Sequence, residues 1–177
     1  YYELGNMYCH GYGVKQDFDI AEEYLIKSAN LDNIKGLNHL GFLYEAVRSK
    51  QNYAKAKECY EKSHSLNSIN AIINLAFLYY EGHSVEKDYP RARQLFQLAI
   101  ERGSANGYYN IGKMYKRGHG FNKDYIKAKE FFEKAGKLGQ MDALHHLGNL
   151  YLHGKGVEQD YSRARELYEI SSKDLIP

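Results

Sequence analysis

The stretch Leu147-Gly148-Asn149-Leu150-Tyr151, followed by Gly154-Lys155-Gly156-Val157 and then by Asp160-Tyr161, decides the fold of this chain because it recurs. The same phrase returns, in steps of 36, 35, 36 and 36 residues, at Leu4, Leu40, Leu75 and Ile111. A fixed period of this length is typical of stacked supersecondary units. The sequence therefore predicts an all-α solenoid of about five helix-turn-helix repeats, each in contact only with its neighbours.

The composition excludes several classes of protein. Of the 177 residues, 44% are hydrophobic and 26% are charged, as in an ordinary globular protein. The net charge of +2 is too small to indicate a nucleic-acid or bulk membrane partner. No apolar run approaches the roughly 18 residues that a membrane-spanning helix needs. We therefore expect no nucleic-acid partner and no membrane insertion in this segment.

The domain organisation follows from the period. The whole chain, residues 1–177, reads as a single solenoid domain that opens inside a repeat, so we expect a fragment of a longer chain. The repeats are predicted at residues 1–35, 36–70, 71–106, 107–142 and 143–177, and residues 173–177 do not supply a further first helix. Cys9 and Cys59 occupy non-equivalent positions, so they form no disulfide framework and are compatible with a reducing compartment.

Each repeat reads as a first helix, a glycine-rich turn and a second helix. Paired glycines such as Gly11 and Gly13 suit a turn that needs positive φ. A carboxylate before the second helix can accept the free backbone N–H groups of its first turn. The predicted caps of the second helices are Asp17, Asn52, Asp88, Asp124 and Asp160.

The second repeat departs from this pattern. Its turn, residues 45–51, contains no glycine, and eight residues instead of nine separate Tyr44 from Tyr53. We therefore expect either a turn of different shape or a first helix that extends beyond the predicted span of residues 36–44. Such irregularities map to loops on one face of a solenoid, although drift in a tolerant loop explains them equally well.

Columns of equivalent residues predict the core. Small residues recur in the first helices at Gly5, Gly41, Ala76, Gly112 and Gly148, and in the second helices at Ala21, Ala56, Ala92, Ala128 and Ala164. We expect facing Gly and Ala residues to let two backbones approach closely. The space beside them is predicted to be filled by one tyrosine column (Tyr8, Tyr44, Tyr79, Tyr115, Tyr151) and one mixed column (Tyr24, Cys59, Leu95, Phe131, Leu167).

These residues resemble the Sel-1-like repeat family, a relative of the tetratricopeptide repeats. Tyr53-Ala54-Lys55-Ala56 and Tyr125-Ile126-Lys127-Ala128 carry the family phrase Y-x-K-A, and Tyr161-Ser162-Arg163-Ala164 replaces Lys with Arg. The resemblance implies a right-handed α/α superhelix that acts as an adaptor or scaffold for protein complexes. Members occur in the bacterial envelope, among secreted bacterial effectors and in the endoplasmic reticulum. A cysteine-rich branch that binds β-lactams is not matched, because its paired cysteines are absent.

The related tetratricopeptide repeats imply that the first helices line a concave face. Counting from the repeat leucine, the inward positions are Phe42, Ile73, Phe77, Tyr80, Tyr109, Lys113, Lys116, Arg117, His145, His146, Asn149 and His153. An aromatic strip beside a basic patch could take an extended or helical peptide that carries acidic residues. The alternative is that the aromatic residues pack between helices and the lysines are solvated.

The signals for metal binding and catalysis are weak. His146 and His153 are two helical turns apart, so about 10 Å separates their backbones, which does not suit two ligands of one zinc ion. The Gly-x-Gly turns lack the Lys-Ser or Lys-Thr of a phosphate loop. Polar pairs that would read RNA bases do not recur from repeat to repeat. We therefore predict no catalytic residue, no metal and no cofactor.

The sequence thus predicts a non-enzymatic protein-protein interaction scaffold that binds a protein or peptide partner on its concave face. One alternative is a small-molecule or cell-wall-fragment (β-lactam-like) binder or hydrolase, as in the cysteine-rich branch. Another is that this stretch is a spacer within a larger protein.

Overall fold

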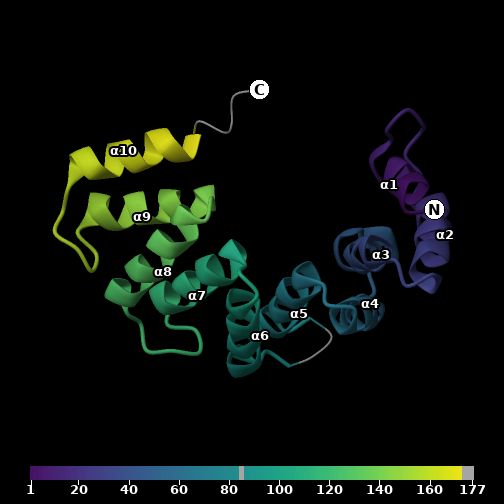
Figure 1. Cartoon of the computed structure of the whole chain (residues 1–177), viewed down its shortest axis with the longest axis horizontal. Coiled ribbons are helices and arrows are strands. Elements are labelled where there is room, and N and C mark those ends of the chain that lie inside the picture. The colour runs from purple at the N-terminus through teal and green to yellow at the C-terminus, as the bar shows by residue number, and fades with distance from the viewer. Residues whose placement is uncertain (84–85, 173–177) are drawn as a thin grey trace. The chain divides into compact units, whose positions relative to one another are not determined.

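We describe a computed structural model of the chain that covers residues 1–83 and 86–172, apart from the side chain of Arg48. Ser84, Val85 and the closing residues 173–177 lie outside the described residues. Within the described ranges the chain forms ten α-helices and one short 3-10 helix, with no β-strand (Figure 1). The all-helical, helix-turn-helix prediction is confirmed.

The chain divides into two compact units, Tyr1–Asp88 and Tyr89–Pro177. The N-terminal unit contains α1 (Tyr2–His10), α2 (Phe18–Asn30), α3 (Ile34–Ala46), η1 (Arg48–Lys50), α4 (Tyr53–Ser65) and α5 (Ile69–Glu81). The C-terminal unit contains α6 (Tyr89–Glu101), α7 (Ala105–Arg117), α8 (Tyr125–Lys137), α9 (Met141–His153) and α10 (Tyr161–Ser172). In each unit, consecutive helices pack against one another, as expected for repeats that contact their neighbours.

The helix ends follow from capping residues. The side chains of Asp17, Asn52 and Asp124 accept hydrogen bonds from backbone N–H groups in the first turns of α2, α4 and α8, as predicted. The first helices begin two residues earlier than the sequence suggested, because Asn33, Ser68 and the equivalent residues of later repeats cap them. In the second repeat, the first helix spans Ile34–Ala46 rather than residues 36–44.

One backbone hydrogen bond closes the turn of every repeat. The N–H of the residue that caps the second helix donates to the carbonyl of the column tyrosine; in the first repeat this bond joins Asp17 N to Tyr8 O at 3.0 Å. The equivalent bond in the second repeat, Asn52 N to Tyr44 O, is 2.7 Å long although this turn is one residue shorter. The first helix is no longer there than elsewhere, so it is the turn that differs in shape.

The shape of that turn follows from the missing glycine. Gly11, Gly82, Gly118 and Gly154 end their helices in the left-handed conformation that glycine adopts without strain. Val47 ends α3 in an extended conformation, with φ −86° and ψ 109°, and the chain then forms the 3-10 helix η1. The glycine-free turn therefore presents Lys50 from a short helix rather than from a loop.

The core contains the predicted small-residue columns, with one correction. Ala21, Ala56 and the equivalent alanines are fully buried, as expected. The side chains that lie against the glycines, however, are one residue further along the second helix than the predicted mixed column. A Cβ added to Gly41 would lie 2.5 Å from the Tyr60 ring, and one added to Gly112 would lie 2.7 Å from the Phe132 ring. Gly41 and Gly112 therefore make room for a buried ring four residues after the alanine of the second helix.

Candidate partner-binding face

The first helices of each unit carry the predicted binding residues. We use the name first-helix face for the side chains of α1, α3 and α5 in the N-terminal unit and of α7 and α9 in the C-terminal unit. In the C-terminal unit the rings of Tyr109 and His146 stack with centroids 5.6 Å apart, and Lys116 Nζ lies 3.3 Å from His146 Nδ1. Helix α7 and helix α9 therefore contribute to one continuous patch of this face.

Burial and neighbouring positive charges lower the pKa of both Lys116 and His146. Burial lowers the pKa of Lys116, and the charges of Arg117 and Lys155 lower it further. Burial also lowers the pKa of His146 to about 4, helped by the charges of Lys116, His145 and Lys113 and opposed by that of Asp142. His146 is thus neutral near pH 7, and its Nδ1 accepts a hydrogen bond from the Lys116 ammonium.

The other predicted residues of the C-terminal unit lie around this contact. Lys113 Nζ lies 5.0 Å above the Tyr109 ring, in cation–π range. His145 points toward α10, where its ring is 5.1 Å from that of Tyr168. Asn149 donates from Nδ2 to the backbone carbonyl of His145 at 3.0 Å. Arg117 and His153 are exposed in the last turns of α7 and α9.

The predicted residues of the N-terminal unit divide into exposed and buried side chains. Phe42 is 55% exposed on α3, which is unusual for a phenylalanine, and Phe77 is half-buried on α5. Ile73 and Tyr80 are only 8% and 6% exposed, so these two side chains belong to the packed interior and offer no open surface. The aromatic strip expected from Phe42 to Tyr80 is therefore reduced to its phenylalanines.

The two first-helix faces carry opposite charge. Helices α1, α3 and α5 contain one lysine, Lys35, and three glutamates. Helices α7 and α9 contain three basic residues, Lys113, Lys116 and Arg117, and one acidic residue, Asp142. The basic patch predicted from the sequence is therefore a property of the C-terminal unit.

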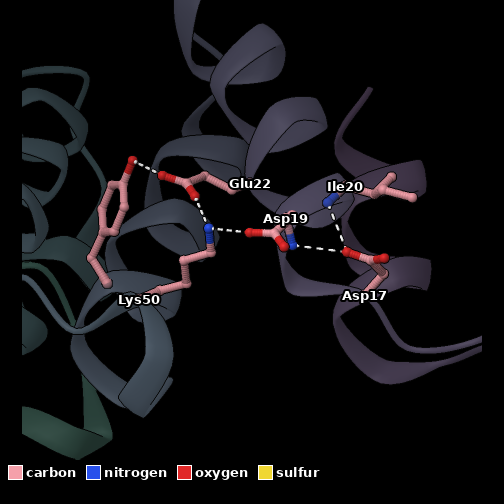
Figure 2. Close-up of polar contacts among 6 residues, drawn as sticks. Asp17, Asp19, Ile20, Glu22 and Lys50 are labelled. Carbon is pink, nitrogen blue, oxygen red and sulfur yellow. Dashed lines mark hydrogen bonds and ion pairs between the residues drawn. The ribbon is translucent and has the colours of Figure 1, made fainter.

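A second polar cluster joins the first two repeats, and the sequence did not reveal it. Figure 2 shows Lys50, from η1, between Asp19 and Glu22 of α2, with Nζ–carboxylate distances of 2.5 and 2.7 Å. Tyr44 donates its hydroxyl hydrogen to Glu22 at 2.8 Å. Burial raises the pKa of Glu22, but the hydrogen bonds from Lys50 and Tyr44 lower it by more. The only sequence signal was the glycine-free turn from which Lys50 extends.

The described residues offer little for catalysis or metal binding. Both cysteines are free and partly buried, and burial raises the pKa of Cys59 to about 11, so it is a thiol near pH 7. No group of three His, Cys, Asp or Glu side chains in the described part of the chain could hold a metal ion. Among residues 1–83 and 86–172, no helix is both long and apolar enough to cross a membrane.

The fold defines a class of protein: an α/α repeat protein built from consecutive helix-turn-helix units. The family model for the Sel1 repeat matches residues 1–33, 35–68, 69–104, 105–140 and 142–174. The chain therefore belongs to the Sel1 repeat family. Proteins of this family generally act as protein-interaction scaffolds and are typically non-catalytic.

Similar solved structures support the assignment of the chain to this family. A Sel1 repeat protein from Oxalobacter formigenes is 28% identical, with a TM-score of 0.85 over 98% of this chain and 71% of its own. The protective antigen c5321 of uropathogenic Escherichia coli is also 28% identical, with a TM-score of 0.79 over 98% of this chain and 37% of its own. A comparison with curated protein sequences finds no match.

The cysteine-rich branch is represented by the cysteine-rich protein B of Helicobacter pylori. It is 31% identical, with a TM-score of 0.54 over 73% of this chain and 94% of its own. The fold is shared, but Cys9 and Cys59 of this chain are both free.

Proposed function

We propose that this chain is a non-enzymatic scaffold that holds a segment of a partner protein on its first-helix face. The observation that carries the proposal is the patch in which Tyr109, Lys116 and His146 from two successive first helices meet. Repeat proteins use such extended surfaces, to which each repeat contributes a few side chains, for binding. The Sel1 repeat family, which mediates protein interactions in general, supports this reading.

In the N-terminal unit, an exposed side chain supports the first-helix face of that unit. Phe42 is a large apolar group left in solvent on α3, and aromatic residues are enriched at the centres of protein interfaces. The buried residues Ile73 and Tyr80 are left out of the proposed contact set. The proposed contact residues that remain are Phe42 and Phe77 in the N-terminal unit and, in the C-terminal unit, Tyr109, Lys113, Lys116, Arg117, His145, His146, Asn149 and His153.

A selection of random peptides displayed on phage tests the proposal. The immobilised chain is compared with Phe42→Asp and Lys116→Glu, which change one first-helix face each. Ile126→Asp is the matched control, because Ile126 is 60% exposed on α8, a second helix. We expect the parent and the control to enrich the same peptides.

The variants locate the contact. Loss of the enriched peptides with Phe42→Asp or Lys116→Glu, at unchanged helical content, is the expected result. Retention by both of these variants together with loss by Ile126→Asp would place binding on the second helices and contradict the proposal. Failure of the parent to enrich any peptide would also contradict it.

A further inference from the structure

We infer that the first-helix face of the C-terminal unit receives an acidic segment of the partner, with a carboxylate that accepts hydrogen bonds from the Lys116 ammonium beside His146. This inference rests on the proposed function and adds the chemistry of the bound segment. Three observations carry it: the charge balance of α7 and α9, the donors that the Lys116–His146 pair presents, and the place of Lys116 in the repeat.

The balance of charged residues on α7 and α9 indicates the sign of the charge that the partner carries. Helix α7 contains Lys113, Lys116 and Arg117 and no acidic residue, and α9 adds only Asp142, in its first turn. Complementary charge at an interface speeds association and disfavours partners of the wrong sign. A segment rich in Asp or Glu therefore fits this surface, and a basic segment is repelled.

The hydrogen-bond donors of Lys116 and His146 indicate which group of the partner they can bind. Because His146 Nδ1 accepts from Lys116, the neutral imidazole carries its hydrogen on Nε2. The Lys116 ammonium has two further N–H donors beyond the one used on His146. The pair thus presents donors without a competing acceptor, which suits a carboxylate, and charge-assisted hydrogen bonds of this kind are the stronger ones.

The place of Lys116 in the repeat argues that the charge is not required by the fold. In the preceding repeat the equivalent residue is Tyr80, which is neutral and 6% exposed. The positive charge of Lys116, in the last turn of α7, is stabilised by the negative end of the helix dipole. That stabilisation, however, is opposed by burial and by the charges of Arg117 and Lys155, which together lower the pKa of Lys116.

A protein partner fits better than a nucleic acid. Nucleic-acid binding needs a basic stripe that follows many phosphates, and this chain has a net charge of only +2. On the first-helix face of the C-terminal unit the lysines and the arginine all come from α7, and the first helices of the N-terminal unit carry mainly acid. A short run of carboxylates matches a patch of this limited extent.

Binding of a carboxylate should be coupled to protonation of His146. Burial and the positive charges of Lys116, His145 and Lys113 hold the pKa of His146 near 4, while Asp142 acts in the opposite sense. A bound anion adds negative charge at the same place and favours the imidazolium form. The pKa of His146 should therefore rise when the acidic segment binds.

The test uses a fluorescein-labelled peptide that alternates glutamate and serine, with the glutamine–serine peptide as the neutral control. Fluorescence anisotropy on the whole chain should show that the glutamate peptide binds at least about tenfold more tightly than the neutral one. Lys116→Met should weaken binding of the glutamate peptide about tenfold. Lys137→Met, which changes an exposed lysine of α8, should leave binding unchanged.

A histidine titration by NMR gives a second readout that does not depend on the variant. We expect the pKa of His146 to rise when the glutamate peptide saturates the chain. Equal binding of both peptides, no binding of either, or tighter binding of an oligouridine RNA would overturn the inference. If the phage selection enriches peptides without acidic residues, the scaffold proposal stands and the acidic inference fails.

Discussion

The first helices of the two units follow one plan but carry opposite charge. Those of the N-terminal unit, α1, α3 and α5, bear one lysine and three glutamates, whereas α7 and α9 bear three basic residues and one aspartate. Packing is the same in both units, since a glycine of a first helix meets a buried ring in each. The packing of the helices therefore does not determine the charge of the first-helix face, so this charge can be specific to a partner.

Two lysines show the same contrast at the level of single side chains. Lys50 lies between the carboxylates of Asp19 and Glu22, and these contacts raise its pKa. Lys116 lies beside a neutral imidazole and other basic groups, and its pKa is lowered. Lys50 thus forms ion pairs within the protein, whereas we propose that Lys116 forms its ion pair with a partner.

The largest expected effect tests the shared packing. Phe132→Ala and Tyr60→Ala each remove a fully buried ring that lies against a first-helix glycine, and each should lower the free energy of unfolding by about 3–5 kcal/mol. Urea denaturation followed by circular dichroism measures the loss. Phe42→Ala, at an exposed position, should change stability by less than about 0.5 kcal/mol. A loss at Phe42 as large as that at Phe132 would contradict this packing.

The glycines themselves give a smaller effect. A Cβ at Gly41 or Gly112 would overlap the Tyr60 or Phe132 ring. Overpacking costs about 1–3 kcal/mol, and alanine recovers about 1 kcal/mol of helix propensity. We therefore expect Gly41→Ala and Gly112→Ala to destabilise the chain by up to about 2 kcal/mol in thermal unfolding. Stabilisation by either change would show that the rings move aside freely.

The two lysines should respond in opposite directions. Lys50→Met leaves Asp19 and Glu22 without their ammonium partner and should lower the melting temperature. Lys116→Met removes a charge that is repelled by Arg117 and Lys155, so the melting temperature should stay the same or rise. Differential scanning fluorimetry of both variants beside the parent decides the matter. If Lys116→Met lowered the melting temperature as much as Lys50→Met, the distinction between the two lysines would be wrong.

Acid should affect the two regions in different pH windows. The pKa of Glu22 is lowered on folding, so its contribution is present above its unfolded value of about 4.3 and is lost as the pH falls below that. The pKa of His146 is lowered to about 4, so its contribution is present above about pH 6.5 and is lost as the pH falls toward 4.

Melting temperatures measured across this pH range test both windows. Glu22→Gln should remove part of the loss below about pH 4.3, and His146→Asn should flatten the slope between about pH 6.5 and 4. Asparagine is the matched choice, because Asn110 holds the equivalent position in the preceding repeat. An unchanged slope with His146→Asn would mean that His146 titrates normally.

Much of the fold could be predicted from the sequence, because it depends on local and periodic signals. Caps such as Asp17 follow from residues within one repeat, and the period of about 36 residues and the small-residue columns follow from comparing one repeat with the next. The sequence predicted that the glycines face alanines, with Cys59 and Phe131 in the space beside them, whereas Gly41 and Gly112 lie against Tyr60 and Phe132, the next residues along the second helices. Adjacent residues of a helix lie only about 100° apart, so periodicity alone does not separate them.

The site was less predictable, because its contacts join residues of different repeats. Lys116 and His146 are 30 residues apart, and Lys50 reaches Glu22 across a repeat boundary. The sequence places these side chains on faces, but the rotamers of long side chains decide which groups meet. Ile73 and Tyr80 were counted as surface residues because position in a helix does not reveal how the neighbouring helices cover it.

The most direct test of the central claim is an NMR titration of the isotopically labelled whole chain with the glutamate–serine peptide. We predict that the largest chemical-shift changes occur at Lys116, His146 and neighbouring residues of α7 and α9, with none at Lys50 or Glu22. Changes concentrated on α2, α4 or α8, or no change at any peptide concentration, would contradict the claim that the first-helix face of the C-terminal unit binds an acidic partner.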